Sequence, residues 1–168
     1  MVLSMQEFVQ SLQNEVRIVL HLAGKVDRAK LDYRPTPKQR STIELLRYIS
    51  MMGPILIRYT TAVTQDPQWW PEAEAAANAR DFDQAVAAIA AQKDLYPQLL
   101  ANVTDASLRE TVTGIDGNPT TRGAIFVNGI LCGCTAYRMQ LFLYLKASGR
   151  EDLTTMDVWA GMDQPAAS

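Results

Sequence analysis

Residues 125–145 read IFVNGILCGCTAYRMQLFLYL, and on a helix this stretch presents apolar side chains on most of its sides. A helix of this kind lies either at the centre of a helical bundle or at an interface shared with a second subunit. Asn128, Arg138 and Gln140 interrupt the run, which therefore falls short of the roughly 18 consecutive apolar residues of a membrane span. The stretch predicts a packed helix in a protein that does not enter a membrane.

Three further long helices are predicted upstream of this stretch from their start signals. Each begins with a Ser or Asp that is followed three residues later by Glu or Gln, and apolar residues then recur at three- and four-residue steps. The pairs are Ser4 with Glu7, Ser41 with Glu44, and Asp81 with Gln84. The four predicted helices cover about 4–23, 41–64, 81–103 and 121–148.

The number and length of these segments predict the fold class. β-branched alternation is nearly absent, so the class is all-α, and a four-helix bundle is the economical architecture. The connections are long: residues 66–80 are predicted to be irregular or only briefly helical, and residues 113–119 are dense in turn formers. The bundle is assigned to 1–150, within a single domain, and a short C-terminal tail, 151–168, is expected to pack on it through Trp159.

Two prolines fall inside predicted helices, where each removes a backbone donor. Pro54 is expected to kink the second helix near residues 50–53, and Pro97 to bend or interrupt the third.

Composition excludes several classes of function. The chain has 168 residues, enough to form a buried apolar core without stabilisation by a disulfide or a structural metal ion. Sixteen Lys and Arg oppose eighteen Asp and Glu, which argues against a dedicated nucleic-acid-binding protein, because such proteins are usually strongly basic. The first residues lack the basic and apolar regions of a signal peptide, so the cytoplasm is the expected compartment.

The counts of histidine and cysteine restrict the chemistry further. His21 is the one histidine, so a Ser-His-Asp or Cys-His site would have to include it, and a site with several histidine ligands cannot form within the chain. His21 is either a half-buried imidazole near a helix C-terminus or a lone general base. Cys132 and Cys134 are two residues apart, on nearly opposite helix faces, and are predicted to be reduced, partly buried thiols.

Two short stretches are open to both a functional and a structural interpretation. Arg34, Lys38, Arg40 and Arg47 are either solvated surface charges or an anion-attracting rim near the start of the second helix. The pair at 69–70, Trp-Trp, either borders a pocket or folds back over the bundle.

Two sequence motifs resemble the DinB/YfiT-like family. Residues 32–41, DYRPTPKQRS, followed by LLRYI at 45–49, are similar to the family's loop and second helix. Residues 137–141, YRMQL, with YLK at 144–146 and Gly149, resemble the end of its fourth helix. The resemblance implies a four-helix bundle that is commonly homodimeric. It also implies kinship with metal-dependent transferases or isomerases that use low-molecular-weight thiols.

The same resemblance predicts that the usual metal site is missing. The family's histidine on the second helix falls on Tyr48, and its H-x-x-x-H pair on the fourth helix falls on Gly133 and Tyr137. Neutral phenols are poor ligands for zinc or nickel, so no divalent metal and no other cofactor is expected. Arg138 and Gln140 match the residues that follow the second histidine of the pair.

Three functions follow from this interpretation. The first is a small-molecule-binding or non-catalytic bundle, and its pocket candidates are Tyr48, Gly133, Cys134, Tyr137, Arg138, Gln140 and Arg47; the two tyrosines would either line a pocket or fill the core. The second is a thiol-dependent transferase or isomerase that uses the charge of Arg47 or Arg138 to lower a thiol pKa. The third is a homodimeric structural protein in which Gly129 and Gly133 allow close helix approach. No nucleic acid and no membrane is expected as a partner.

Overall fold

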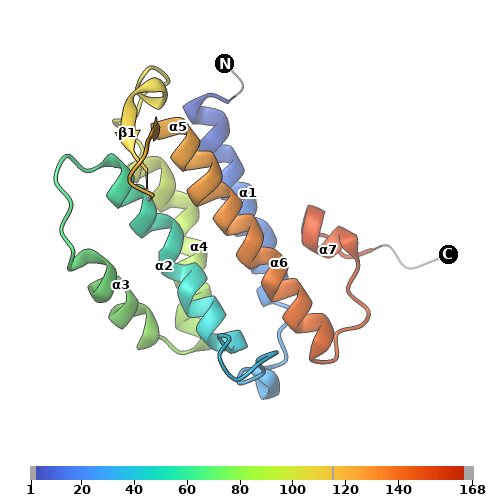
Figure 1. The fold of residues 1–168 in the computed structure, drawn as a ribbon. Helices are drawn as coiled ribbons and strands as arrows, with labels where there is room; N and C mark the ends of the chain where they lie inside the picture. Colours follow the sequence, from blue (N-terminus) through green and yellow to red (C-terminus); the bar gives the residue numbers. More distant parts are fainter. Residues whose placement is uncertain (1–2, 115, 165–168) are drawn as a thin grey trace.

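The computed structural model describes residues 3–114 and 116–164, and these residues are mostly helical (Figure 1). Its long helices are α1 (Met5–Ala23), α2 (Thr42–Thr61), α4 (Phe82–Leu99) and α6 (Cys132–Ala147). Helix α1 contacts α4 and α6, and α2 contacts the same two helices. The apolar core lies between these four helices. None of the described helices has the length and apolar character needed to cross a membrane.

The predicted start signals mark the true beginnings of three helices. Ser4, Ser41 and Asp81 each accept a hydrogen bond from the backbone N–H three residues on, and the side chain at that position bonds back. In α1 the apolar stripe is buried, with Phe8, Leu12 and other members almost inaccessible to solvent. Helix α1 ends at Ala23, with Gly24 as its cap.

Neither internal proline breaks its helix. Helix α2 is continuous through Pro54 but ends at Thr61, where Ala62 adopts extended backbone, and not near residue 64 as expected. Helix α4 runs past Pro97 to Leu99, so the helix is not interrupted at Pro97, and the bend named as the alternative stays a prediction. A proline removes one backbone donor, and the packing of the buried faces of both helices outweighs that loss.

A ten-residue helix occupies most of the segment predicted to be irregular or briefly helical. Helix α3 (Trp69–Asn78) contacts α2 and is followed directly by α4. Its alanine-rich sequence has high intrinsic helix propensity. Ala77 packs with Met51 and Ile55, and Trp69 and Trp70 cover the same cluster. The tryptophan pair therefore folds back over α2.

The turn-rich segment before the last helix forms a β-hairpin that the sequence analysis did not predict. Strand β1 (Thr111–Thr113) pairs antiparallel with β2 (Pro119–Thr121), with Val112 opposite Thr120. A short 3₁₀ turn, η2 (Ser107–Arg109), precedes it, and η1 (Arg28–Lys30) lies between α1 and α2. Strands of three residues are too short for a period-2 pattern to stand out.

The last long helix is continuous but not uniform. It begins with α5 (Arg122–Ile125), which is capped by Thr121, continues through the π-helical segment η3 (Phe126–Leu131), and ends in α6. Gly149, with φ +117°, follows its end. Leu143 is 55% exposed, so α6 is not buried on all sides.

The C-terminal tail folds as a short helix against the long ones. Helix α7 (Thr155–Ala160) lies beside the long helices and contacts α1 and α6 (Figure 1). Its Val158 side chain is buried. Trp159 is 70% exposed, so the prediction that it packs on the bundle is wrong. One residue along a helix rotates a side chain by about 100°, and burying Val158 therefore turns Trp159 outwards. The end of the predicted tail, residues 165–168, lies outside the described residues.

Candidate functional site

A cleft of about 870 Å³ lies between the C-terminal half of α2 and the start of the last long helix. We call it the α2–η3 cleft. Small-molecule sites in proteins typically enclose about 300–1,000 Å³, so this cleft has the size to hold a small organic ligand. Its apolar and aromatic walls include Leu56, Tyr59, Trp70, Ile125 and Ile130, and residues 112–114 of the hairpin close one side.

Arg122 places a positive charge in the wall of this cleft. One guanidinium nitrogen donates to the Thr60 carbonyl oxygen, and Nη2 lies 2.9 Å from a carboxylate oxygen of Glu110. Its Nε is buried and has no hydrogen-bond partner among residues 3–114 and 116–164. Arg122 thus joins the end of α2 to the hairpin. Arg122 was not among the predicted site residues. A basic residue in the first turn of a helix is unfavourable for the helix dipole, so its presence there is a signal that it makes a tertiary contact or binds a ligand.

The π-helical segment forms part of the cleft wall through Gly129 and Ile130. A π turn spaces its hydrogen bonds five residues apart and is uncommon, and such segments are frequent at functional sites. Gly129 leaves open space there, because a Cβ at this position would meet only Ile125, at 3.7 Å. The π-helical segment was not predicted, since the sequence pattern of a π turn resembles that of an α-helix.

The structure brings Tyr48 and Tyr137 together, and we call them the tyrosine pair. Their ring centroids are 4.8 Å apart with an interplanar angle of 64°. The guanidinium carbon of Arg40 lies 3.9 Å from the centre of the Tyr48 ring, and the Trp70 ring lies 6.3 Å away. Burial, and after it the neighbouring Tyr137 phenol, raises the pKa of Tyr48 to about 12. The Tyr48 hydroxyl is therefore neutral at physiological pH.

The residues at the expected metal position do not fit a metal ion. Gly133 provides no donor, and a Cβ added to it would lie 3.5 Å from the methyl carbon of Met52. Met52 is buried, and its thioether is a poor ligand for zinc or nickel. With a neutral phenol at Tyr48, this set lacks the imidazole and carboxylate donors that such ions require.

Arg138 and Cys134 belong to α6 and lie near a carboxylate that α1 supplies, that of Glu15. Arg138 Nη1 donates to Glu15 Oε1 at 2.7 Å, and both side chains are almost fully buried. Thr135 Oγ1 lies 3.2 Å from the same oxygen. Burial, opposed by Arg138, raises the pKa of Glu15. Burial, and after it the Glu15 charge, raises the pKa of the Cys134 thiol to about 12.

This arrangement limits what the predicted site residues can do chemically. Cys134 is a protonated thiol at neutral pH and so a weak nucleophile. The guanidinium group of Arg138 is already in an ion pair with Glu15, so its charge is not available to activate a thiol. Cys132 is exposed, which corrects the prediction that both thiols are partly buried.

Arg47 and Gln140 make structural contacts of their own. Arg47 Nε donates to the Arg80 carbonyl oxygen at 2.7 Å, which joins α2 to the connection between α3 and α4. Gln140 Nε2 donates to the Tyr144 hydroxyl oxygen at 2.7 Å, and that hydroxyl donates to the Arg40 carbonyl oxygen. Of the seven predicted pocket residues, Tyr48 and Tyr137 are in edge-to-face contact, and Tyr48 lines a small pocket of about 310 Å³.

The sequence analysis also missed a buried polar layer beside α2. Gln92 Nε2 donates to the Ile49 carbonyl oxygen at 3.0 Å, and the Tyr96 hydroxyl donates to Gln92 Oε1 at 2.8 Å. Gly53 lies against this hydroxyl. Gln92 and Tyr96 are four residues apart on α4, so the spacing of two polar groups on one helix face was the available signal.

The basic residues before α2 border a smaller pocket of about 310 Å³. Arg34, Lys38 and Arg40 line it, but Glu44 and Glu74 line it too. Arg34 Nη2 lies 3.3 Å from a Glu44 oxygen. The predicted anion-attracting rim is therefore partly neutralised by its own acidic neighbours.

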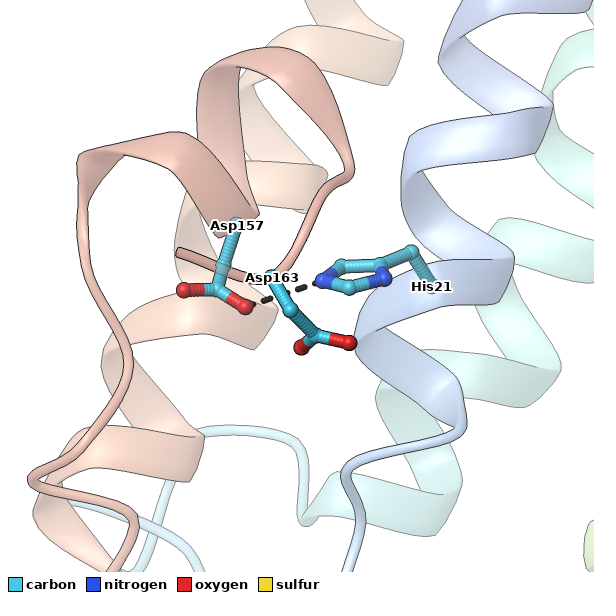
Figure 2. Close-up of side chains that lie close together, drawn as sticks. All are labelled: His21, Asp157 and Asp163. Carbon is cyan, nitrogen blue, oxygen red and sulfur yellow. Dashed lines mark hydrogen bonds and ion pairs between the residues drawn. The ribbon is translucent and has the colours of Figure 1, made fainter. Parts of the chain in front are cut away.

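His21 meets the C-terminal tail and not the tyrosine pair (Figure 2). Its Nε2 lies 2.9 Å from Asp157 Oδ1, and a carboxylate oxygen of Asp163 lies within 4.8 Å of ligand atoms of both residues. We call His21, Asp157 and Asp163 the tail cluster. Lys25 forms an ion pair with Asp163 at its edge. Although burial works against it, hydrogen bonds from Thr154 and His21 hold the pKa of Asp157 below its usual range.

Comparison with known proteins adds no identification to these observations. No protein-family model matches the chain, and no curated protein matches its sequence.

Proposed function

We propose that the chain is a DinB/YfiT-like four-helix bundle that binds a small molecule in the α2–η3 cleft. The pairwise contacts of α1 and α2 with both α4 and α6 support the bundle. The edge-to-face contact of Tyr48 with Tyr137 supports the family assignment, because the two positions that correspond to metal ligands lie side by side.

The bundle acts without the family's metal. The corresponding positions hold a neutral Tyr48 phenol, Tyr137 and Gly133, which has no side chain to donate, and Met52 lies beside the glycine. Metal analysis of wild-type protein and of the Tyr48→Phe variant, both purified without chelator, tests this. We expect identical metal contents, and a metal lost only in the variant would contradict the proposal.

The α2–η3 cleft is the observation that carries the binding function. It combines an apolar wall with aromatic rings at Tyr59 and Trp70 and a cationic side chain at Arg122. Such a lining suits a ligand with an aromatic or aliphatic body and a carbonyl or other hydrogen-bond-accepting group, because the charge of Arg122 is already paired with Glu110. The thiol-dependent transferase is less well supported, because Arg138 and Arg47 are held by Glu15 and the Arg80 carbonyl group.

A cleft-filling substitution tests the binding site. Gly129→Leu places a side chain in the cleft, whereas Asn128→Leu adds the same side chain at an exposed position one residue earlier. The probe is 8-anilinonaphthalene-1-sulfonate, an apolar anion whose fluorescence rises on apolar surfaces. We expect Gly129→Leu to weaken probe binding about tenfold and Asn128→Leu to leave it unchanged. Equal binding by both variants would place the probe elsewhere and contradict the proposal. Native mass spectrometry of untreated protein then identifies any retained ligand.

A homodimer is a second proposal, and exposed apolar side chains on adjacent elements favour it. Leu143 of α6 is 55% exposed, and Met156 and Trp159 of α7 are 40% and 70% exposed. Gly133 packs against Met52 of the same chain, so the interface would use this outer surface and not the glycine pair. Light scattering after size exclusion measures the mass, and Leu143→Glu should convert a dimer to a monomer. A strict monomer at micromolar concentration would rule it out.

A further inference from the structure

The tail cluster brings together three metal-binding types of side chain that are far apart in sequence (Figure 2). His21 comes from the last turns of α1, Asp157 from α7, and Asp163 from the segment that follows α7. One ligand atom from each of the three lies within 4.8 Å of the others. The His21 and Asp157 side chains are 15% and 4% exposed, so two of the three donors are held in place by packing.

We propose that the tail cluster binds a divalent transition-metal ion such as Zn²⁺ through His21 Nε2 and one oxygen each of Asp157 and Asp163. Water would complete the coordination sphere. This site is separate from the α2–η3 cleft and from the tyrosine pair, and it does not depend on either of them.

The observed spacing is close to that of shared coordination. Two donor atoms that lie about 2.1 Å from one ion are about 3.4 Å apart at the tetrahedral angle that zinc prefers, so the two atoms nearest each other, now at hydrogen-bond distance, would have to separate by about 0.5 Å. His21 Nε2 and Asp157 Oδ1 are 2.9 Å apart. The Asp163 side chain is 71% exposed, so it can rotate to bring its oxygen into bonding distance. An imidazole with two carboxylates selects zinc-like ions over Mg²⁺ and Ca²⁺, which prefer oxygen ligands alone.

The hydrogen bonds around Asp157 leave one of its oxygens available. The Thr154 backbone N–H and hydroxyl both donate to Asp157 Oδ2, at 2.7 Å and 3.2 Å. These bonds orient the carboxylate so that Oδ1 faces His21, as an outer shell does for a metal ligand. Coordination would use the Nε2 lone pair, so the ion would replace the proton that His21 and Asp157 share, and the imidazole would carry its proton on Nδ1.

Lys25 competes with the ion for this site. Its ammonium group pairs with Asp163, and an incoming cation must displace it. Arg150, whose pKa is raised mainly by its bond to Asp152, adds a weaker positive charge near the same carboxylates. The site is therefore expected to be moderate in affinity, and removal of the Lys25 charge should strengthen it.

Calorimetry with Zn²⁺ and absorption spectroscopy with Co²⁺ test the site. Full-length protein in a Cys132→Ser background excludes binding to the exposed thiol. We expect one ion per chain, a Co²⁺ spectrum without thiolate charge-transfer bands, and no comparable binding of Mg²⁺. His21→Gln and Asp163→Asn should each weaken Zn²⁺ binding about tenfold or more, and Lys25→Met should strengthen it.

Asp152→Asn is the matched control, because this carboxylate lies in the same tail but pairs with Arg150. It should leave the Zn²⁺ affinity unchanged. Asp163→Asn changes a mostly exposed side chain, so its effect does not depend on refolding of the core. Absence of binding at millimolar Zn²⁺, or binding that persists unchanged in His21→Gln, would overturn the proposal. Equal loss with Asp152→Asn would also overturn it, since it would indicate a diffuse acidic surface.

Discussion

Gly53 is the residue at which the interior tolerates no side chain. A Cβ there would lie 2.2 Å from the Tyr96 hydroxyl oxygen and 3.1 Å from the ring carbon that bears it. A glycine in a helix interior costs roughly 0.5–1 kcal/mol relative to alanine. Here the glycine lets α4 approach α2 closely enough for Tyr96 to bond Gln92, and for Gln92 to bond the backbone of α2.

We predict that Gly53→Ala destabilises the protein by about 1–3 kcal/mol, because the added methyl group must push the Tyr96 ring out of its buried position. Urea unfolding measures the change in the free energy of unfolding. Gly24→Ala is the control, since a Cβ there meets only its own helix at ordinary contact distance, and it should be neutral or slightly stabilising. The penalty should shrink in a Tyr96→Phe background; an unchanged penalty would mean that the hydroxyl is not the obstacle.

The Glu15–Arg138 pair shows how a single charged residue on an apolar stripe marks a tertiary contact. Glu15 falls among Leu12, Val16 and Val19 on the buried face of α1. Glu15 Oε2 and Arg138 Nε are buried without partners among the described residues, so the pair is enclosed but incompletely satisfied. Such a pair contributes little net stability, yet loss of one partner leaves an unpaired buried charge.

We therefore predict that Arg138→Met costs about 3–5 kcal/mol, and that Glu15→Leu added to it recovers much of this loss. The double-mutant cycle by urea unfolding gives the coupling energy between the two side chains. If the double variant is as unstable as the sum of the two single variants, the side chains are not coupled as their 2.7 Å contact indicates.

At the level of elements, helix beginnings depend on local chemistry. Ser41 is buried, its Oγ accepts from the Glu44 backbone N–H at 3.4 Å, and Glu44 Oε2 accepts from the Ser41 N–H at 2.6 Å. Because these groups lie within four residues of each other, the sequence identifies the start of α2.

We predict that Ser41→Ala lowers the free energy of unfolding by about 1 kcal/mol, since the partly buried N–H of Glu44 loses its partner. Ser4→Ala, at the more exposed start of α1, should cost less because water can replace the lost bond. Thermal and urea unfolding of both variants provide the comparison. A larger loss for Ser4→Ala would show that burial does not set the cost of the missing cap.

The elements that the sequence analysis missed have weak local signals. The strands of the hairpin are three residues long, and the π turn differs from an α-helix by one residue of hydrogen-bond spacing. At the prolines the local signal is incomplete: Pro54 and Pro97 each remove one backbone hydrogen bond, but tertiary packing of α2 and α4 decides whether each helix continues.

At the scale of the whole molecule, the Glu15–Arg138 pair joins α1 to α6, and the titration of Glu15 makes the stability of the fold depend on pH. Burial raises the pKa of Glu15 above its ordinary value of 4.5, so the folded protein retains this proton at a pH at which the unfolded chain has released it. The contribution of Glu15 to stability is therefore largest at pH values below its ordinary pKa of 4.5. It declines as the pH rises through the folded-state pKa.

We predict that the difference in unfolding free energy between wild-type protein and Glu15→Gln shifts in favour of the variant as pH rises from about 4.5 towards 8. The glutamine does not titrate, so the difference isolates Glu15 from the other carboxyl groups. Urea unfolding at several pH values measures it. A difference that grows in favour of wild-type protein would mean that attraction to Arg138 outweighs burial.

The sequence by itself determined the helical class, the beginnings of the main helices and the presence of tyrosine or glycine, and not histidine, at positions 48, 133 and 137. These features depend on residue identity and on contacts within a few residues. The tertiary structure decided which side chains meet: Tyr48 with Tyr137, Glu15 with Arg138, and His21 with Asp157. It also decided where a cleft remains, because that depends on how helices, hairpin and tail pack in three dimensions, and no local pattern encodes that packing.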